Sequence, residues 1–173
     1  MFIEPKTVVW IAGASGRLGR AIEHKLDHSR YTIIPTDIEV DITDLTTVVQ
    51  HADTYRPEII INCAAMARKE DAEANPDLAY KVNALGARNL AIAATSSAAT
   101  LVHLSTDDLF PGVIAHPINE FDKTLPPHIL RQVERSGRAF GSRAVLSSHY
   151  RTLKLGIYGQ RRRSYRASSE GVP

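Results

Sequence analysis

Short apolar runs alternate along this chain with longer segments in which apolar residues recur at helical spacing. The runs are too short for buried helices and are rich in β-branched residues, so they predict buried strands at 7–12, 31–35, 59–65 and 100–105. The segments between them predict helices over 18–26, 44–55 and 76–97. Strands that alternate with helices in this way predict an α/β fold, a Rossmann-like, doubly wound parallel sheet.

Two of the helices carry start signals in the sequence. Thr43 or Asp44 stands where a side chain caps the second helix, and Arg56-Pro57-Glu58 ends that helix. Asn75-Pro76 predicts a capping residue followed by a first-turn proline for the third helix.

A glycine-rich turn follows the first strand and opens the first helix: Gly13-Ala-Ser15-Gly16-Arg17-Leu18-Gly19. Glycine permits a tight turn and close approach of the backbone to a pyrophosphate, and the free N–H groups at the helix start attract its charge. The turn therefore predicts a dinucleotide cradle. A glycine-rich turn that merely closes a βα unit has the same appearance, so that interpretation stays open.

An acidic residue follows the second strand. Asp37 lies about 20 residues beyond the glycines, where a carboxylate accepts hydrogen bonds from the adenosine ribose. Its neighbours are Ile38 and Glu39 rather than a Lys or Arg that would bind a 2′-phosphate, which favours NAD over NADP. A solvated acidic turn is the alternative.

All strand exits of a parallel sheet with right-handed crossovers lie at one edge. The sequence therefore predicts that the glycine turn, Asp37, the small residues Ala64 and Ala65, and Thr106 converge there. Small side chains at this edge leave room for a flat ligand. This convergence is the main argument for a site.

Composition limits the classes of partner. The 173 residues carry a net charge of +2, too little to indicate a nucleic-acid partner, although four arginines gather in 161–166. The only cysteine, Cys63, excludes an internal disulfide and a cysteine-rich zinc site, and we expect no metal. No apolar run approaches the roughly 20 residues of a membrane span. We therefore expect a cytoplasmic protein that binds neither membrane nor nucleic acid, with its oligomeric state, a homodimer included, left open.

Several segments together resemble the dTDP-4-dehydrorhamnose reductase family, which belongs to the extended short-chain dehydrogenases/reductases. They are the glycine turn, Asp41-Ile-Thr-Asp44, Arg56-Pro-Glu-Ile-Ile-Ile-Asn-Cys-Ala-Ala65, Val82-Asn-Ala-Leu-Gly-Ala-Arg-Asn-Leu90 and Leu104-Ser-Thr-Asp-Asp-Leu-Phe-Pro-Gly112. The resemblance implies reduction of a 4-keto deoxysugar nucleotide by NAD or NADP, as in dTDP-rhamnose biosynthesis. It places the pyrophosphate on Gly16, Arg17 and Leu18, the adenosine on Asp37, Asp41 and Ile42, and the nicotinamide beside Ala64, Ala65 and Met66.

The same resemblance implies a catalytic Thr-Tyr-Lys set, and this chain lacks two of its members. Thr106 supplies the hydroxyl and, with Asp107, faces the sugar, but Leu130 and Glu134 occupy the positions of the tyrosine and lysine. Leucine cannot donate a proton, and a carboxylate would repel a phenolate. The chain as written is therefore expected not to catalyse the reduction. A non-catalytic, dinucleotide-binding module similar to the regulatory subunit of methionine adenosyltransferase remains the alternative.

A shifted reading frame accounts for the loss. Leu130 to Ala139 can be encoded as TTA CGG CAA GTC GAA AGA TCG GGG AGA GCA, and removal of the first base yields Tyr-Gly-Lys-Ser-Lys-Asp-Arg-Gly-Glu, the pattern that the family implies. We therefore expect a frameshift between Asp122 and Leu130. Residues 1–125 would form the NAD(P)-binding Rossmann domain, and 126–173 an irregular tail in place of the catalytic helix and substrate domain. True divergence of the tail is the alternative.

Resequencing of the gene from codon 115 to beyond codon 173 tests this frameshift. We expect a one-base offset to open a continuous frame that encodes Tyr-Gly-Lys-Ser-Lys. If neither one-base offset opens a continuous reading frame, Leu130 and Glu134 are true substitutions.

Overall fold

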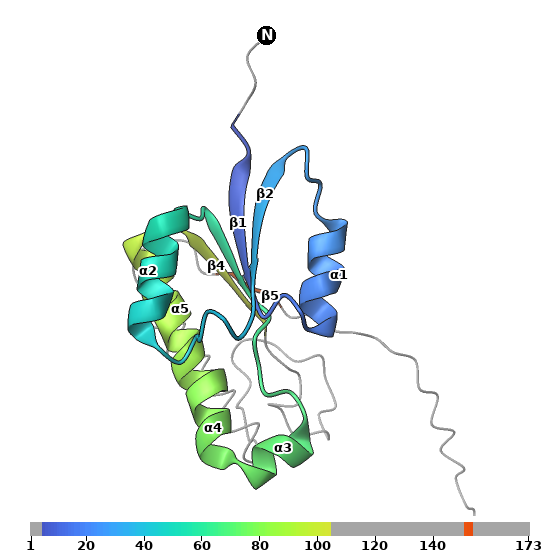
Figure 1. The fold of residues 1–173 in the computed structure, drawn as a ribbon, viewed down its shortest axis with the longest axis vertical. Helices are drawn as coiled ribbons and strands as arrows, with labels where there is room; N and C mark the ends of the chain where they lie inside the picture. Colours follow the sequence, from blue (N-terminus) through green and yellow to red (C-terminus); the bar gives the residue numbers. More distant parts are fainter. Residues whose placement is uncertain (1–4, 105–150, 154–173) are drawn as a thin grey trace, which may run out of the picture.

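A parallel sheet forms the centre of the molecule in the computed structural model, which describes residues 5–104 and 151–153 (Figure 1). The strand order is β2-β1-β3-β4-β5, and every neighbouring pair is parallel. From β1 the chain adds β2 on one side of the sheet and then adds β3 and β4 on the other side. The strand order therefore reverses between β1 and β3, as in a doubly wound fold. The predicted fold class is thus confirmed. The strands are β1 Thr7–Ala12, β2 Tyr31–Thr36, β3 Ile59–Asn62, β4 Thr100–Leu104 and β5 Arg151–Leu153.

The short strand β5 adds to the four strands that the sequence predicts. It pairs with β4 in parallel, with Val102 opposite Arg151 and Leu104 opposite Leu153. Without β5, strand β4 would lie at the edge of the sheet with unpaired backbone groups. Such an edge is a template for pairing with a further strand, and β5 occupies it. The rest of the segment expected to be irregular lies outside the described residues.

The helices lie on both faces of the sheet. Helix α1 covers one face, whereas α2 and α5 pack side by side on the other (Figure 1). The helical elements are α1 Arg17–Lys25, α2 Leu45–Tyr55, α3 Lys69–Ala74, α4 Pro76–Tyr80, the π-helix η1 Lys81–Gly86 and α5 Ala87–Ser96. The single long helix predicted over 76–97 is therefore interrupted by a π turn, and α3 was not predicted. None of the helices in the described ranges is long and apolar enough to span a bilayer.

The predicted signals at the start of α2 are confirmed. The Asp44 carboxylate accepts a hydrogen bond from the Thr46 N–H at 2.8 Å and another from the Thr47 hydroxyl at 2.8 Å. These hydrogen bonds lower the pKa of Asp44, the bond from Thr47 contributing most. The helix ends at Arg56, which adopts a left-handed conformation with φ of 46°.

The predicted capping role of Asn75 is wrong for its side chain, although Pro76 is the first residue of α4 as expected. Asn75 also ends α3, with φ of −136° and ψ of 67°. In this position its Nδ2 lies 3.5 Å from the Asp71 carbonyl oxygen behind it, rather than its Oδ1 facing the N–H groups of α4. Because Asn75 both ends α3 and precedes α4, its side chain contacts the helix behind it and does not cap the helix ahead.

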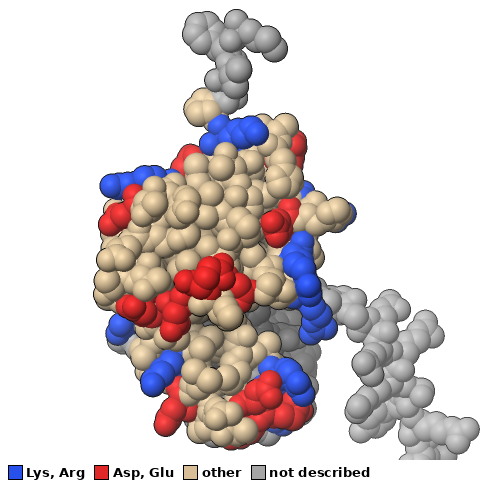
Figure 2. All heavy atoms as spheres, in the orientation of Figure 1, with Lys and Arg blue, Asp and Glu red and all other residues tan. Residues whose placement is uncertain are grey.

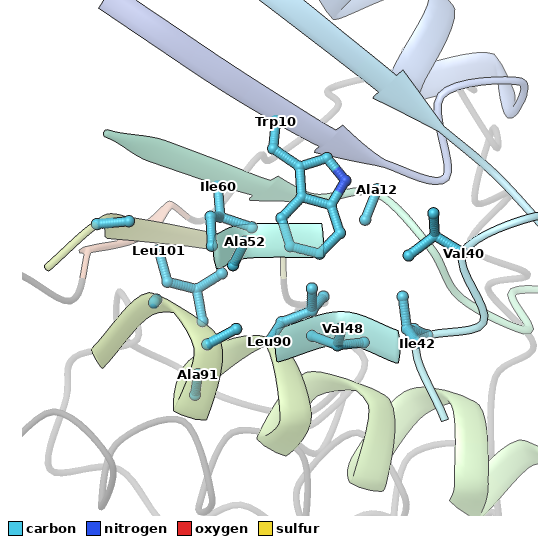
Figure 3. Close-up of a cluster of buried hydrophobic side chains, with 13 residues drawn as sticks. Trp10, Ala12, Val40, Ile42, Val48, Ala52, Ile60, Leu90, Ala91 and Leu101 are labelled. Carbon is cyan, nitrogen blue, oxygen red and sulfur yellow. The ribbon is translucent and has the colours of Figure 1, made fainter. Parts of the chain in front are cut away.

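The larger apolar cluster lies between the sheet and the pair α2 and α5 (Figure 3). Trp10 and Ile60 contribute the large side chains from the strands, and both are fully buried. Helix α5 contributes mostly alanines, whose small side chains allow it to lie close to both α2 and the sheet. A smaller cluster on the opposite face joins Val9 and Ile11 to α1.

One histidine is packed within an aromatic row at the edge of the larger cluster. The ring of His51 lies between Trp10 and Tyr55, with centroid separations of 4.5 Å and 4.6 Å. Its Nε2 is buried and has no hydrogen-bond partner in the part of the chain that the structure describes. Burial lowers the pKa of His51, and the charge of Glu39 only partly opposes this effect.

This burial makes the stability of the protein depend on pH. A histidine whose pKa is lowered on folding binds fewer protons in the folded state than in the unfolded state. Its contribution to the free energy of unfolding is therefore complete above the unfolded-state pKa of 6.5 and is lost as the pH falls below that pKa. His51→Phe keeps an aromatic ring at this position but cannot be protonated. We expect this variant to lose less stability than the parent between about pH 7 and pH 5. Urea unfolding at each pH measures this difference, and parallel pH profiles would contradict it.

Candidate functional site

The glycine turn joins β1, β3 and α1 at the carboxyl edge of the sheet. Gly13 has a φ of +77°, and a Cβ on it would lie 2.5 Å from the backbone nitrogen of Ala64. A Cβ on Gly19 would lie 2.4 Å from the carbonyl oxygen of Gly13. Both glycines are therefore required by the protein's own packing.

Gly16 differs from the other two glycines of the turn. Its φ of −65° and ψ of 165° suit any residue, and among the described residues a Cβ would meet only the Gly13 carbonyl oxygen, at 3.3 Å. It is the N-cap of α1, and no side chain caps this helix start or places a negative charge in its first turn. The absence of a side chain at Gly16 therefore leaves space beside free N–H groups, which is the arrangement that suits an anion.

Two cavities meet at this glycine. One, of about 470 Å³, runs toward the end of β2 and is lined by Asp37, Asp41 and Ile42 among others. The other, of about 550 Å³, runs toward the end of β4 and is lined by Arg17, Leu18, Asn83 and His103 among others. Both are lined by Gly16, Cys63, Ala64 and Ala65. The structure thus brings together the predicted residues of the glycine turn with those that follow β2 and β3.

Asp37 lies at the predicted place, but part of its carboxylate is already engaged. Oδ2 accepts hydrogen bonds from the Ser15 N–H at 2.9 Å and from the Ser15 hydroxyl. The backbone N–H of Asp37 donates to Glu39 Oε1 at 2.6 Å. Asp37 therefore fixes the glycine turn through Oδ2, and none of these three hydrogen bonds uses its Oδ1.

Ile38 is a lining residue of the first cavity that the sequence did not single out. Its side chain is 90% exposed, unusual for a large apolar residue, and it stands between Asp37 and Glu39. Acidic side chains gather in the middle of the face shown in Figure 2, above a hollow. Single apolar residues on a surface are common, so the sequence held no signal that would have marked Ile38 as part of a site.

Asn83 holds the segment that leaves β3. Its Oδ1 accepts a hydrogen bond from the Met66 N–H at 2.8 Å, and its Nδ2 donates to the Met66 carbonyl oxygen at 3.1 Å. Asn83 is 3% exposed and lies in the π-helix η1. Met66, a predicted residue of the nicotinamide side, is thus held in place by a side chain that the sequence did not identify as functional.

Asn89 holds the opposite wall in the same manner. Its Nδ2 donates to the carbonyl oxygens of Ile42 and Thr43 at 2.9 Å and 3.0 Å. Gly86 lets η1 approach Ile42 closely, because a Cβ there would lie 2.5 Å from Ile42 Cδ1. One continuous helical segment therefore positions both walls, and its π turn is of the kind often found at functional sites.

The ends of β3 and β4 are joined by side chains. Asn62 Oδ1 accepts from the Ala64 N–H at 3.0 Å, and Asn62 Nδ2 lies 3.1 Å from His103 Nδ1. His103 is 5% exposed and is therefore a hydrogen-bonded residue of the core. Burial raises the pKa of Cys63 to about 11, so its thiol stays protonated and unreactive at neutral pH.

The remaining predicted residues, Thr106, Asp107, Leu130 and Glu134, lie outside the described residues. Within residues 5–104 and 151–153, no cluster of three or more His, Cys, Asp or Glu could hold a metal ion.

Comparison with known proteins assigns the family. The family model described as "RmlD substrate binding domain" matches residues 7–155. The chain belongs to this RmlD family. The match begins at β1 and includes every described strand.

Characterised relatives and a solved structure agree with this assignment. A dTDP-4-dehydrorhamnose reductase of Streptomyces griseus is 37% identical over 150 residues, which is 86% of this chain and 49% of that protein. The crystal structure of a dTDP-4-dehydrorhamnose reductase from Bacillus anthracis in complex with NADP matches with a TM-score of 0.80 and 37% identity, over 87% of this chain and 53% of that one.

A second class of relative is also similar. Methionine adenosyltransferase 2 subunit beta of Rattus norvegicus is 30% identical over 136 residues, 69% of this chain and 41% of that protein. This RmlD-family chain thus spans about half the length, or less, of the curated relatives that it matches.

We expect Asn83→Ala to lower the free energy of unfolding of this RmlD-family chain by about 1–3 kcal/mol, because the N–H and C=O groups of Met66 lose their partner. Asn75→Ala is the matched control, since the exposed Asn75 side chain makes only a 3.5 Å contact and its loss should cost about 0.5 kcal/mol or less. Equal effects of the two substitutions on urea unfolding would contradict the role of Asn83.

Proposed function

We propose that this chain binds NAD or NADP at the carboxyl edge of its sheet. The observation that carries the proposal is the pair of cavities that meet at Gly16, beside the uncapped start of α1. A dinucleotide has two nucleoside halves joined by a pyrophosphate, and this arrangement offers one cavity to each half and backbone N–H groups to the charge between them.

Each proposed contact follows from the position of the residue. The pyrophosphate lies over the start of α1, the adenosine in the cavity toward β2, and the nicotinamide half in the cavity toward β4. Gly16, Arg17 and Leu18, proposed for the pyrophosphate, line a cavity, as do Asp37, Asp41 and Ile42 for the adenosine and Ala64 and Ala65 for the nicotinamide half. Gly13 and Ser15 line the adenosine cavity beside them, whereas Gly19 and Met66 line neither cavity and act through the shape of the turn and of the segment after β3.

Among the two cofactors we propose NAD as the tighter ligand. Asp37 and Asp41 line the adenosine cavity, and Glu39 is hydrogen-bonded to the backbone of Asp37. A 2′-phosphate placed beside these carboxylates would be repelled, whereas a ribose hydroxyl can donate to one of them. The Bacillus anthracis relative was crystallised with NADP, so the preference is one of degree.

The reaction that we propose for the intact protein is reduction of a 4-keto deoxysugar nucleotide by hydride from the bound nicotinamide, as in dTDP-rhamnose biosynthesis. Thr106 and Asp107 would face the sugar. Proton transfer to the 4-keto oxygen needs an acid, and Leu130 offers none, while Glu134 offers no cation in place of a lysine. Residues 1–125 would therefore bind the cofactor without completing the reaction, and the segment 126–173 would contribute no catalytic pair.

A non-catalytic regulatory module is the second candidate function. The specific observation in its favour is the same pair, Leu130 and Glu134, together with the similarity to methionine adenosyltransferase 2 subunit beta. Such a module keeps the cofactor site and dispenses with turnover. Either function fits a protein of the cytoplasm, where a lone thiol such as Cys63 stays reduced.

Calorimetric titration with NADH and NADPH tests cofactor binding. We expect saturable binding of both, tighter for NADH, and a loss of about tenfold or more in Gly16→Ala, whose added methyl group would enter the space shared by the cavities. Lys25→Ala, at the far end of α1, is the control and should bind as the parent does. Absence of binding to the parent would overturn the proposal.

The same preparation should not oxidise NADH when dTDP-4-dehydrorhamnose is added. Turnover would show that Leu130 and Glu134 do not abolish catalysis, and it would favour the reductase over the regulatory module.

A further inference from the structure

The only tryptophan of the chain makes a polar contact at the end of β2. Trp10 is fully buried in the middle of β1, and its indole Nε1 donates to the Thr36 hydroxyl at 2.8 Å. The strand register places Trp10 opposite Ile34 and Ala12 opposite Thr36, so the indole reaches two residues along the sheet to make this bond. In Figure 3 the indole nitrogen lies on the side of the ring that faces Val40.

Thr36 in turn holds the glycine turn. Its carbonyl oxygen accepts hydrogen bonds from the N–H groups of Gly13 at 2.9 Å and Ala14 at 2.8 Å. The next residue, Asp37, accepts from the N–H of Ser15. Three successive amides of the turn are therefore bound by two successive residues at the end of β2.

The indole N–H is the donor that the structure gives to the Thr36 hydroxyl oxygen. Thr36 is 6% exposed, so its hydroxyl has little access to water and needs a partner within the protein. Loss of the indole N–H would leave this buried hydroxyl without its donor. The hydroxyl belongs to the same residue whose carbonyl binds the glycine turn, next to Asp37, so any repacking around it acts directly on both anchors of the turn. Packing alone does not require this N–H, since a phenyl ring fills much of the same space.

We propose that Trp10 is a positioning residue for the nucleotide, whose indole N–H holds the end of β2 in the arrangement that binds the adenosine half. The inference rests on the proposed function, because it concerns the affinity of that same site. Trp10 itself touches neither cavity, and it acts through Thr36 and Asp37.

Titration of the full chain with ADP-ribose tests the proposal. We expect Trp10→Phe, which keeps a ring and removes the N–H, to weaken ADP-ribose binding about tenfold. Ile60→Val is the matched control, because Ile60 is a fully buried member of the same cluster with no part in the chain of hydrogen bonds. It should lower the unfolding temperature and leave the affinity unchanged.

A double-mutant cycle separates positioning from general destabilisation. Thr36→Val removes the acceptor while it keeps the shape, so Trp10→Phe should have little further effect on affinity in the Thr36→Val background. Independent losses that multiply, or losses that follow the unfolding temperature across all variants including Ile60→Val, would overturn the proposal.

Fluorescence supplies a direct signature. Since Trp10 is the only tryptophan, its emission should change as ADP-ribose binds to the parent, with the calorimetric affinity, and should change less in Thr36→Val. Tryptophan emission that does not change when ADP-ribose binds would contradict the proposed link between Trp10 and the nucleotide site. Failure of the parent to bind ADP-ribose would overturn the proposed function, whereas equal binding by parent and Trp10→Phe would overturn only this inference.

Discussion

The close approach of Gly13 to the backbone of Ala64 is the constraint on which the rest of the site depends. A methyl group cannot be inserted between these two segments, nor between Gly19 and Gly13. The exits of β1 and β3 and the start of α1 are thereby pressed together at the point where the strand order reverses. Because the protein's own backbones occupy the space at Gly13 and Gly19, Gly16 is the one glycine of the turn whose missing side chain leaves room for a ligand.

Around this point the strands end and their backbone groups lose sheet partners, and buried asparagines replace them. Asn62, Asn83 and Asn89 each bind a backbone group of a segment that leaves a strand, and each is at most 3% exposed. An amide side chain offers both a donor and an acceptor, so it can hold an irregular segment as a strand would. The polar groups in this core thus shape the walls of the site while they leave its surface free for a ligand.

Much of the fold and the location of the site could be predicted from the sequence, because strands, glycine turn and the Asp44 cap depend on neighbours along the chain. The meeting of strand exits followed from the handedness of crossovers alone. What could not be predicted depends on contacts distant in sequence or, at Asn75, on two helices that share one residue. The π turn at Asn83 has no periodicity of its own, the side chain of Asn75 serves the preceding helix, and the bond from Trp10 to Thr36 joins residues 26 positions apart.

On the proposed function, cofactor binding and catalysis depend on different parts of the chain. Every residue that lines the two cavities in the described structure lies between Gly13 and Leu104, and the asparagines that hold them lie there too. The positions expected to supply the reacting groups come later, at Thr106 and at the places of the tyrosine and lysine that Leu130 and Glu134 occupy. A change confined to the later part would therefore remove the proton donor and leave the described lining of the two cavities unaltered. On this proposal, nucleotide binding can persist when catalysis is lost, because every described residue that lines the two cavities precedes the expected catalytic helix.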